Sequence, residues 1–385
     1  MFLEKTIREN SALADYAVYA HQNGLIRPDS YIVDVDTFLC NAEAIKKEAD
    51  SHSIRLYYML KQLGRNPYLA RFLDNLGYDG AVVVDFKEAA VMMENGIRIG
   101  NAGHLVQIPE SMLSSLISYG VDNMTVYSLE KARSINEAAG RLCRVQNVFI
   151  RVYDDCDMLY SGQSAGFHIS RLEDTVRQLE ALENIRISGV TSFPCYLYSP
   201  ECGDIAPTAN LNTVLKAERM LCAAGYDNLM TNTPSATCCR TLRLMAERGG
   251  NCGEPGHGLT GTTPLHAQRD LEERPCVLYL SEVSHRFQGL SYAYGGGHYR
   301  RSHVSSALVG RKLDAMKKAG VIPPSDESID YHFGLDCQAD VGDSVIMAYR
   351  FQIFVTRSDV VLVEGLSDGQ PRIAAVYDSL GRKKQ

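Results

Sequence analysis

Apolar, β-prone runs alternate with helix-patterned segments through the middle of the chain. Eight such runs begin near Arg55, Gly80, Ile97, Met124, Val145, Ile185, Asn228 and Asn251. In the segments between them, apolar residues recur every three or four positions, which is the spacing of one helix face. Eight strand–helix units in about 220 residues are typical of a TIM barrel, whose active site lies at the C-terminal ends of its strands. We therefore expect an α/β fold with a (β/α)8 barrel over residues 41–272.

Local signals mark where three of the barrel helices begin. Asp85 with Glu88, and Ser170 with Glu173, match the capping box, in which side chains bond the free amides of a helix's first turn. Pro67 stands where a first helical residue would, because its fixed φ suits that position. We expect helices to start at these places.

The pattern changes near residue 273 to short β-prone runs joined by Gly, Asp and Pro turns. We expect a C-terminal β-domain over residues 273–385, with one short basic helix near residues 311–318. Residues 1–40 precede the barrel. They are predicted to form a helical arm and a strand, residues 31–36, that joins the C-terminal sheet.

Composition and charge limit the surroundings of the protein. Of 385 residues, 45% are hydrophobic and 22% charged, which excludes disordered, collagen-like and coiled-coil chains. The net charge of −7 argues against nucleic acid as a partner. The longest segment without a charged residue, residues 187–200, is too short to span a membrane, and the N-terminus lacks a secretion signal, so we expect a cytoplasmic protein. The eleven cysteines form no C-x-x-C pair, and we expect no metal.

Three features could carry chemistry. Lys61 ends the first predicted barrel strand, where a partly desolvated lysine could form a Schiff base, although a merely solvated lysine is the alternative. The glycine-rich residues 253–261 follow the eighth strand, where backbone amides could bind a phosphate, and Ser235 follows the seventh. Residues 256–261 also match the dinucleotide fingerprint, but outside the βαβ unit which that fingerprint needs. In the β-domain, three tyrosines flank a triple glycine within residues 291–301.

The order of these motifs resembles the fold type III enzymes that depend on pyridoxal 5′-phosphate (PLP), such as alanine racemase and ornithine decarboxylase. The motifs are YIVDVD, the strand-end lysine, the serine after strand seven, EPGH after strand eight and YGGGHY in the β-domain. YYMLKQLGRNP, HLVQIP, SYAYGGGHYRR and YDSLG are similar to the YhfX-like family of amino-acid racemases. The resemblance covers nearly the whole chain.

The resemblance implies a role for each motif residue. Lys61 would hold PLP as a Schiff base and act as one acid/base, and Glu254 would face the pyridine nitrogen. The ligands of the phosphate would be Ser235, Gly256, His257 and Tyr377. In these families the β-domain of one subunit completes the barrel mouth of the other. Tyr294 would therefore be the second acid/base, acting in a homodimer with shared active sites.

This sequence also departs from the alanine racemase pattern. Glu254 replaces an arginine at the pyridine nitrogen, and a carboxylate there favours a protonated, more electron-withdrawing ring. The histidine of the sixth-strand T-H-F motif is Ser192 here. Residues 164–167 lack the arginine that helps to bind the substrate carboxylate. Alanine is therefore not the expected substrate.

We predict an isomerase, an amino-acid racemase that uses Lys61 and Tyr294 on opposite faces of the substrate α-carbon. A PLP-dependent decarboxylase or lyase of the same fold is the alternative that Glu254 favours. A PLP-binding protein without turnover is the alternative of another class, and the complete β-domain with Tyr294 argues against it. An oxidoreductase is a further alternative, which would require residues 256–261 to bind a dinucleotide.

Overall fold

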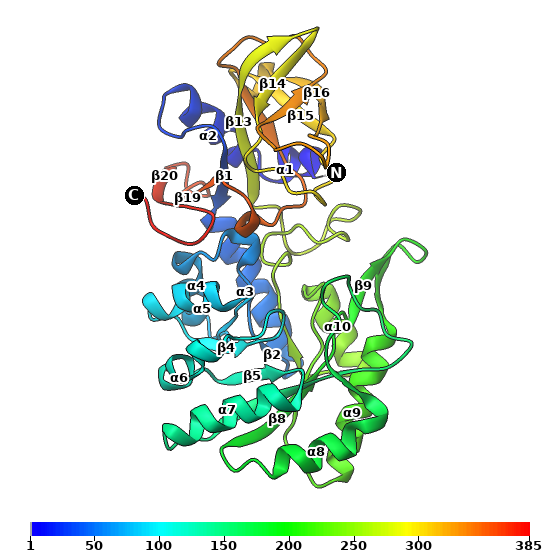
Figure 1. Ribbon diagram of the computed structural model, residues 1–385. Helices are drawn as coiled ribbons and strands as arrows, with labels where there is room; N and C mark the ends of the chain where they lie inside the picture. The colour runs from blue at the N-terminus through cyan, green and yellow to red at the C-terminus, as the bar shows by residue number, and fades with distance from the viewer. Residues whose placement is uncertain (1) are drawn as a thin grey trace. The chain divides into compact units, whose positions relative to one another are not determined.

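The computed structural model describes residues 2–385, which form two compact units (Figure 1). The barrel unit contains Glu43–Leu60 and Pro67–Gly258. The β-unit contains the chain up to Ala42, the short segment Lys61–Asn66, and Leu259–Gln385. Among the described residues, no helix combines the length and the apolar character that a membrane crossing requires.

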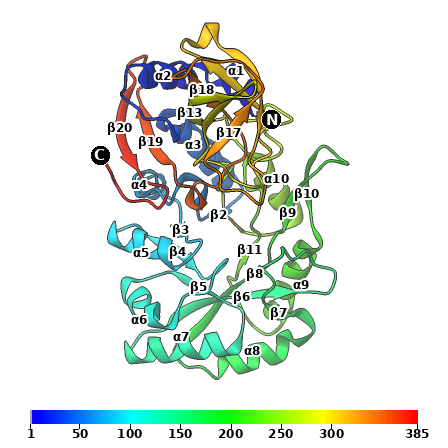
Figure 2. The ribbon, with the colours of Figure 1, turned by 45° about the horizontal axis from the view of Figure 1, so that its top comes forward.

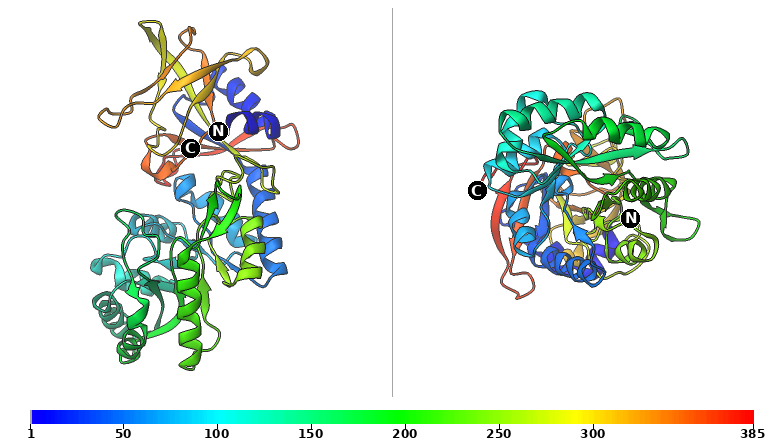
Figure 3. Two further views of the ribbon diagram at one scale, coloured as in Figure 1. Left: turned by 90° about the vertical axis from the view of Figure 1, so that its right-hand side faces the viewer. Right: turned by 90° about the horizontal axis from the view of Figure 1, so that it is seen from below.

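In the barrel unit, a short strand, β7 (Phe167–His168), pairs with β6 at the side of the sheet, and the other eight parallel strands of the sheet form one continuous path. They are β2 (Arg55–Leu56), β3 (Ala81–Val82), β4 (Ile99–Ala102), β5 (Asn123–Val126), β6 (Gln146–Tyr153), β8 (Ile185–Thr191), β11 (Met230–Asn232) and β12 (Cys252–Gly253). They pair in the order β2-β12-β11-β8-β6-β5-β4-β3. A bridge between Tyr58 and Ala81 joins the two ends of this path, and the Val82 amide donates to the Tyr58 carbonyl at 2.7 Å. The predicted parallel barrel is confirmed, and Figure 3 shows its cyan to green helices around the strands.

The helices follow the strands as the apolar pattern predicts. They are α4 (Pro67–Asn75), α5 (Phe86–Glu94), α6 (Glu110–Tyr119), α7 (Leu129–Arg141), α8 (Leu172–Glu180), α9 (Ala209–Ala223) and α10 (Cys239–Arg248). The Asp85 carboxylate accepts from the Glu88 amide at 2.8 Å, so the predicted cap of α5 is confirmed. The predicted cap at Ser170 is wrong. Ser170 lies inside the turn η2 (Ile169–Arg171), and its amide donates to the imidazole of His168 at 3.3 Å, so a different side chain supplies the acceptor.

Inside the barrel, small and large residues interlock. Tyr57, Met59, Val82, Phe149 and Cys252 form one buried apolar cluster. Gly100 on β4 makes room for the Tyr57 ring, since a Cβ at this glycine would lie 2.3 Å from that ring. These contacts fill part of the barrel interior.

A nine-stranded sheet forms the β-unit. Its strands are β1 (Ser30–Asp34), β13 (Val277–Phe287), β14 (Leu290–Tyr294), β15 (Ser306–Gly310), β16 (Lys317–Ile322), β17 (His332–Leu335), β18 (Ser344–Met347), β19 (Asp359–Glu364) and β20 (Arg372–Tyr377). Strand β1 pairs antiparallel with β13 and parallel with β19, which confirms that the early run joins the C-terminal sheet. Figure 2 shows β19 beside β20 at one end of the strand order.

The N-terminal arm is helical, as predicted, with α1 (Leu3–Glu9) and α2 (Ser11–Gln22). Apolar residues of α2 join the sheet in one buried cluster, in which Leu13 and Ala17 lie with Ile32 and Leu278. A third helix, α3 (Val35–Ser51), follows β1.

The basic helix predicted near residues 311–318 is wrong. Only the short turn η3 (Leu313–Ala315) is helical there, and Lys317 already begins β16. Ala319 and Val321 alternate with more exposed neighbours along β16, so their burial against the sheet decides the conformation.

Candidate active site

Glu254 is the central acidic group at the mouth of the barrel. It follows β12 directly, and its side chain is only 2% exposed. Its Oε1 accepts from Asn232 Nδ2 at 2.7 Å, and its amide donates to Thr237 Oγ1 at 3.2 Å. Asn232 Nδ2 also lies 3.1 Å from Thr191 Oγ1 on the next strand, β8. The ends of three neighbouring strands therefore fix the orientation of this carboxylate.

His104 lies on the other side of Glu254 and was not assigned from the sequence. It follows β4 by two residues and is fully buried, with Nε2 3.9 Å from Glu254 Oε2. The Phe193 ring meets its imidazole edge-on, with the ring centroids 5.8 Å apart. The sequence offered two signals for His104, namely its position just after a barrel strand and its place as the first residue of the family-like segment HLVQIP.

Arg151 on β6 was also missed. It is 1% exposed, and its Nη1 donates to Tyr127 Oη at 3.1 Å and to the His104 carbonyl at 3.4 Å. The Tyr127 hydroxyl itself donates to that carbonyl. Burial raises the pKa of Tyr127, and the adjacent guanidinium opposes that rise. Tyr127 is therefore a neutral hydroxyl at pH 7.

The proposed phosphate ligands lie at the ends of the two neighbouring strands β11 and β12. Ser235 lies between β11 and α10 in a left-handed conformation, with φ of 101°. Gly256 is buried and His257 half-buried, and both follow β12. Gly258 brings the two loops together, because a Cβ there would lie 2.2 Å from the Thr237 carbonyl oxygen. The structure therefore places Ser235, Glu254, Gly256 and His257 on one side of the barrel mouth.

Lys61 and Tyr377 belong to the β-unit. Lys61 begins the turn η1 (Lys61–Leu63). Strand β2 ends at Leu56, but hydrogen bonds to neighbouring barrel segments continue as far as the amide of Met59, which donates to the Pro255 carbonyl at 3.0 Å. Gly64, with φ of 67°, packs this segment against the end of β20, since a Cβ there would lie 3.1 Å from the Ser379 carbonyl oxygen. Tyr377 is the buried last residue of β20. The action of Lys61 and Tyr377 on a cofactor in the barrel mouth stays a prediction.

Tyr294 ends β14 and is 37% exposed. It pairs across the sheet with His332 on β17, and the two ring centroids are 6.0 Å apart. His332 meets His285 edge-on at 4.9 Å, and His285 stacks on Tyr292 at 4.8 Å. Burial, and then the charge of His285, lower the pKa of His332, so this imidazole is neutral at pH 7.

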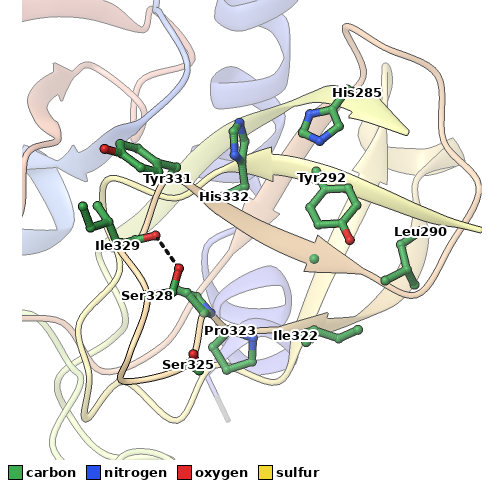
Figure 4. A pocket seen from close by; sticks show the side chains of 12 residues that line it. His285, Leu290, Tyr292, Ile322, Pro323, Ser325, Ser328, Ile329, Tyr331 and His332 are labelled. Carbon is green, nitrogen blue, oxygen red and sulfur yellow. Dashed lines mark hydrogen bonds between the residues drawn. The ribbon is translucent and has the colours of Figure 1, made fainter. Parts of the chain in front are cut away.

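The rings of His285, Tyr292 and His332 line a pocket of about 420 Å³ in the β-unit (Figure 4). The rest of its wall includes Ile322, Pro323, Ile329 and Tyr331. Tyr294, the predicted second acid/base, therefore lies across the sheet from the pocket residue His332, on an exposed face that carries several aromatic side chains.

One other cluster in the barrel unit has the composition of a metal site. His168 Nε2 lies 3.5 Å from Asp154 Oδ1 and 3.3 Å from Asp155 Oδ1. Its Nδ1 accepts from the Ser170 amide at 3.3 Å, so Nε2 is the ring nitrogen that faces the carboxylates. We interpret the cluster as two carboxylates, of Asp154 and Asp155, that interact with the His168 imidazole.

The sequence matches two family models. "Alanine racemase, N-terminal domain" covers residues 33–264, and "YhfX-like, C-terminal domain" covers residues 278–373. The Escherichia coli (strain K12) protein YhfX is 44% identical over 382 residues, 99% of each chain.

Solved structures share the fold. D-threonine aldolase from Filomicrobium marinum superposes with a TM-score of 0.68 at 15% identity, over 93% of this chain and 96% of that one. Alanine racemase from Clostridium difficile 630 gives a TM-score of 0.64 at 18% identity, over 92% and 99% of the two chains. Identities this low establish a common fold and leave the reaction open.

Proposed function

Because the chain belongs to the YhfX family and carries the barrel domain of alanine racemases, we propose that it is a PLP-dependent enzyme acting at the α-carbon of an amino acid. The reaction we propose is racemisation. The observation that carries the proposal is the buried Glu254 carboxylate, held at the barrel mouth beside Ser235, Gly256 and His257.

The chemistry of these residues fits PLP. A fixed carboxylate suits a protonated pyridine nitrogen, and a serine hydroxyl with the backbone amides of Gly256 and His257 suits a phosphate. When bound, PLP supplies an electron sink for the electron pair left on the α-carbon. Glu254 would be the residue that faces the ring nitrogen and favours its protonation, and the Asn232 amide fixes the orientation of this carboxylate.

Two residues move the α-proton in this proposal. Lys61 would hold the cofactor as a Schiff base and would take or return the proton on one face of the substrate. Tyr294, from the β-unit of a second subunit, serves the opposite face. The pKa of the neighbouring His332 is lowered, so this neutral imidazole adds no second charge beside the tyrosine. In this proposal the active form is a homodimer, and the substrate is an amino acid or a derivative of one.

A lyase or decarboxylase of the same fold is the second candidate. A carboxylate opposite the pyridine nitrogen withdraws electrons strongly enough to serve cleavage reactions as well as proton transfer. One of the structural relatives is itself an aldolase, which acts on D-threonine.

The test uses the purified protein loaded with PLP and a panel of single amino-acid enantiomers in D2O. A visible absorbance band that borohydride removes would indicate the covalent link to lysine. Deuterium at the α-carbon together with loss of chirality is the result expected for a racemase. Release of CO2 or an aldehyde without racemisation would replace the racemase with a decarboxylase or an aldolase. A loaded protein that exchanges no α-proton with any of the panel would be a binding protein.

A further inference from the structure

Arg151 is a buried cation whose partners are all neutral. Its Nη2 donates to the Gln163 carbonyl at 2.9 Å, in addition to the Nη1 bonds to Tyr127 and His104, and its guanidinium lies 5.0 Å from the centre of the Tyr127 ring. Among residues 2–385, no aspartate or glutamate forms an ion pair with it. The guanidinium is fixed in place but its charge is not neutralised.

Buried arginines are almost always paired with an anion, because removing a charge from water costs far more than neutral hydrogen bonds return. The three hydrogen bonds go to neutral acceptors, which uncharged N–H or O–H groups could also satisfy, so they do not by themselves require a positive charge. A retained, unneutralised charge at 1% exposure therefore points to an anion that arrives from outside the chain.

The anion would arrive at the barrel mouth. The three groups that Arg151 contacts follow the C-terminal ends of β4, β5 and β6. His104 links the cation to Glu254, since its carbonyl accepts from Arg151 and its Nε2 lies 3.9 Å from the Glu254 carboxylate. On β8, Thr191 is the register partner of Arg151 and bonds the Asn232 that orients Glu254.

We propose that Arg151 binds the α-carboxylate of the amino-acid substrate. This inference rests on the proposed function and adds a binding residue to it. The planar fork of an arginine matches a carboxylate, and a buried setting strengthens the attraction. Residues 164–167, which have no arginine, border on Arg151, because a Cβ on Gly166 would lie 2.9 Å from its carbonyl oxygen. The substrate therefore carries a free carboxylate.

The same contact argues for racemisation over decarboxylation. Loss of CO2 moves negative charge off the carboxylate, so a cation bound there stabilises the substrate more than the transition state. Removal of the α-proton leaves the carboxylate charged, and the Arg151 contact persists throughout. If Arg151 binds the carboxylate, racemisation is therefore favoured over decarboxylation.

The test measures carboxylate binding by the holoenzyme, with propionate as the probe and propionamide as its neutral counterpart, by titration calorimetry. Arg151→Met should weaken propionate binding at least tenfold and leave propionamide unchanged. Arg151→Lys, which keeps the charge but loses the fork, should fall between the wild type and the Met variant. The matched control is Arg186→Met on the same barrel, an exposed arginine of β8 that bonds Asn147. It should change neither affinity.

Turnover gives a second measurement. With the best amino-acid substrate, the Arg151 variants should raise KM for α-proton exchange by a larger factor than they lower kcat. If Arg151→Met does not fold, Arg151→Lys carries the test. Propionate that binds wild type and variant equally, or binds neither, would overturn the inference. The borohydride-sensitive band reports the proposed function separately, because propionate binding can be measured whether or not that band appears.

Discussion

At the scale of single residues, the site is organised around one buried carboxylate and one buried guanidinium. Glu254 could be assigned from the sequence because EPGH is a local motif next to a predicted strand end. Arg151 could not, because nothing in FIRVY distinguishes a buried cation with neutral partners from an arginine at the surface. His104 begins the family-like segment HLVQIP, but neither its burial nor its position beside Glu254 could be predicted from that segment. Arg151 and His104 are buried by contacts between strands that are distant in the sequence, and such contacts cannot be predicted from a local motif.

Lys61→Ala should abolish the covalent link to PLP, because we assign the Schiff base to this amine alone. The measurement is the visible band of the loaded protein before and after borohydride. Lys46→Ala is the control, since Lys46 lies on α3 and forms an ion pair with Asp50. A borohydride-reducible band that persists in the Lys61 variant would reject the assignment.

Glu254→Gln should keep PLP bound but slow α-proton exchange by about 100-fold, because a neutral amide does not hold a proton on the ring nitrogen. The measurement is deuterium incorporation at the α-carbon under saturating substrate. Glu247→Gln, at an exposed position of α10, is the matched control and should exchange at the wild-type rate. Equal rates in both variants would mean that protonation of the ring does not limit the reaction.

At the scale of elements, the sequence pattern predicted the eight barrel strands, and it also predicted that the early strand β1 pairs within the C-terminal sheet. They failed where a distant contact outweighed a local signal. Ser170 has the spacing of a helix cap, but it lies inside the turn η2, where its own amide donates to the His168 imidazole. Lys317 and its neighbours are basic enough for a surface helix, but β16 gains ladder pairs with β15 and β17. Neither the hydrogen bond to His168 nor the pairing of β16 with its two neighbouring strands can be predicted from a short segment of sequence.

Asp85→Ala should lower the free energy of unfolding by about 1 kcal/mol, because the Glu88 amide of α5 loses its acceptor. Ser170→Ala is the comparison, and we expect it to change stability by less than about 0.5 kcal/mol, since its hydroxyl caps no helix. Urea unfolding midpoints of the two variants measure the difference. Equal losses would contradict the observed helix starts.

At the scale of the whole molecule, the chain order does not follow the division into units. The segment Lys61–Asn66 interrupts the barrel sequence, yet it belongs to the β-unit, where Gly64 packs on Ser379. A linear division of the sequence at residues 41 and 273 has no means of detecting this, because the contact joins residues more than 300 positions apart. The predicted lysine is therefore supported by the same unit that carries Tyr294 and Tyr377.

The proposed sharing of active sites leads to a test on mixed dimers. Lys61→Ala and Tyr294→Phe subunits should each be inactive in racemisation, and Tyr294→Phe should still bind PLP because its anchors lie elsewhere. If Tyr294 acts in the partner's site, each heterodimer has one site with both bases and one with neither. Random exchange of equal amounts should then restore roughly a quarter of the wild-type sites.

Racemisation measured as subunits exchange gives the answer, with heterodimers counted by differential tagging. In the homodimer of Tyr294→Phe, exchange of the α-proton should persist on the face that Lys61 serves, so the loss falls unequally on the two substrate enantiomers. Wild-type chains mixed with wild-type chains control for losses during exchange. Heterodimers that form but stay inactive would assign Tyr294 to its own subunit's site or remove it from the chemistry, and the shared-site model would fall with it.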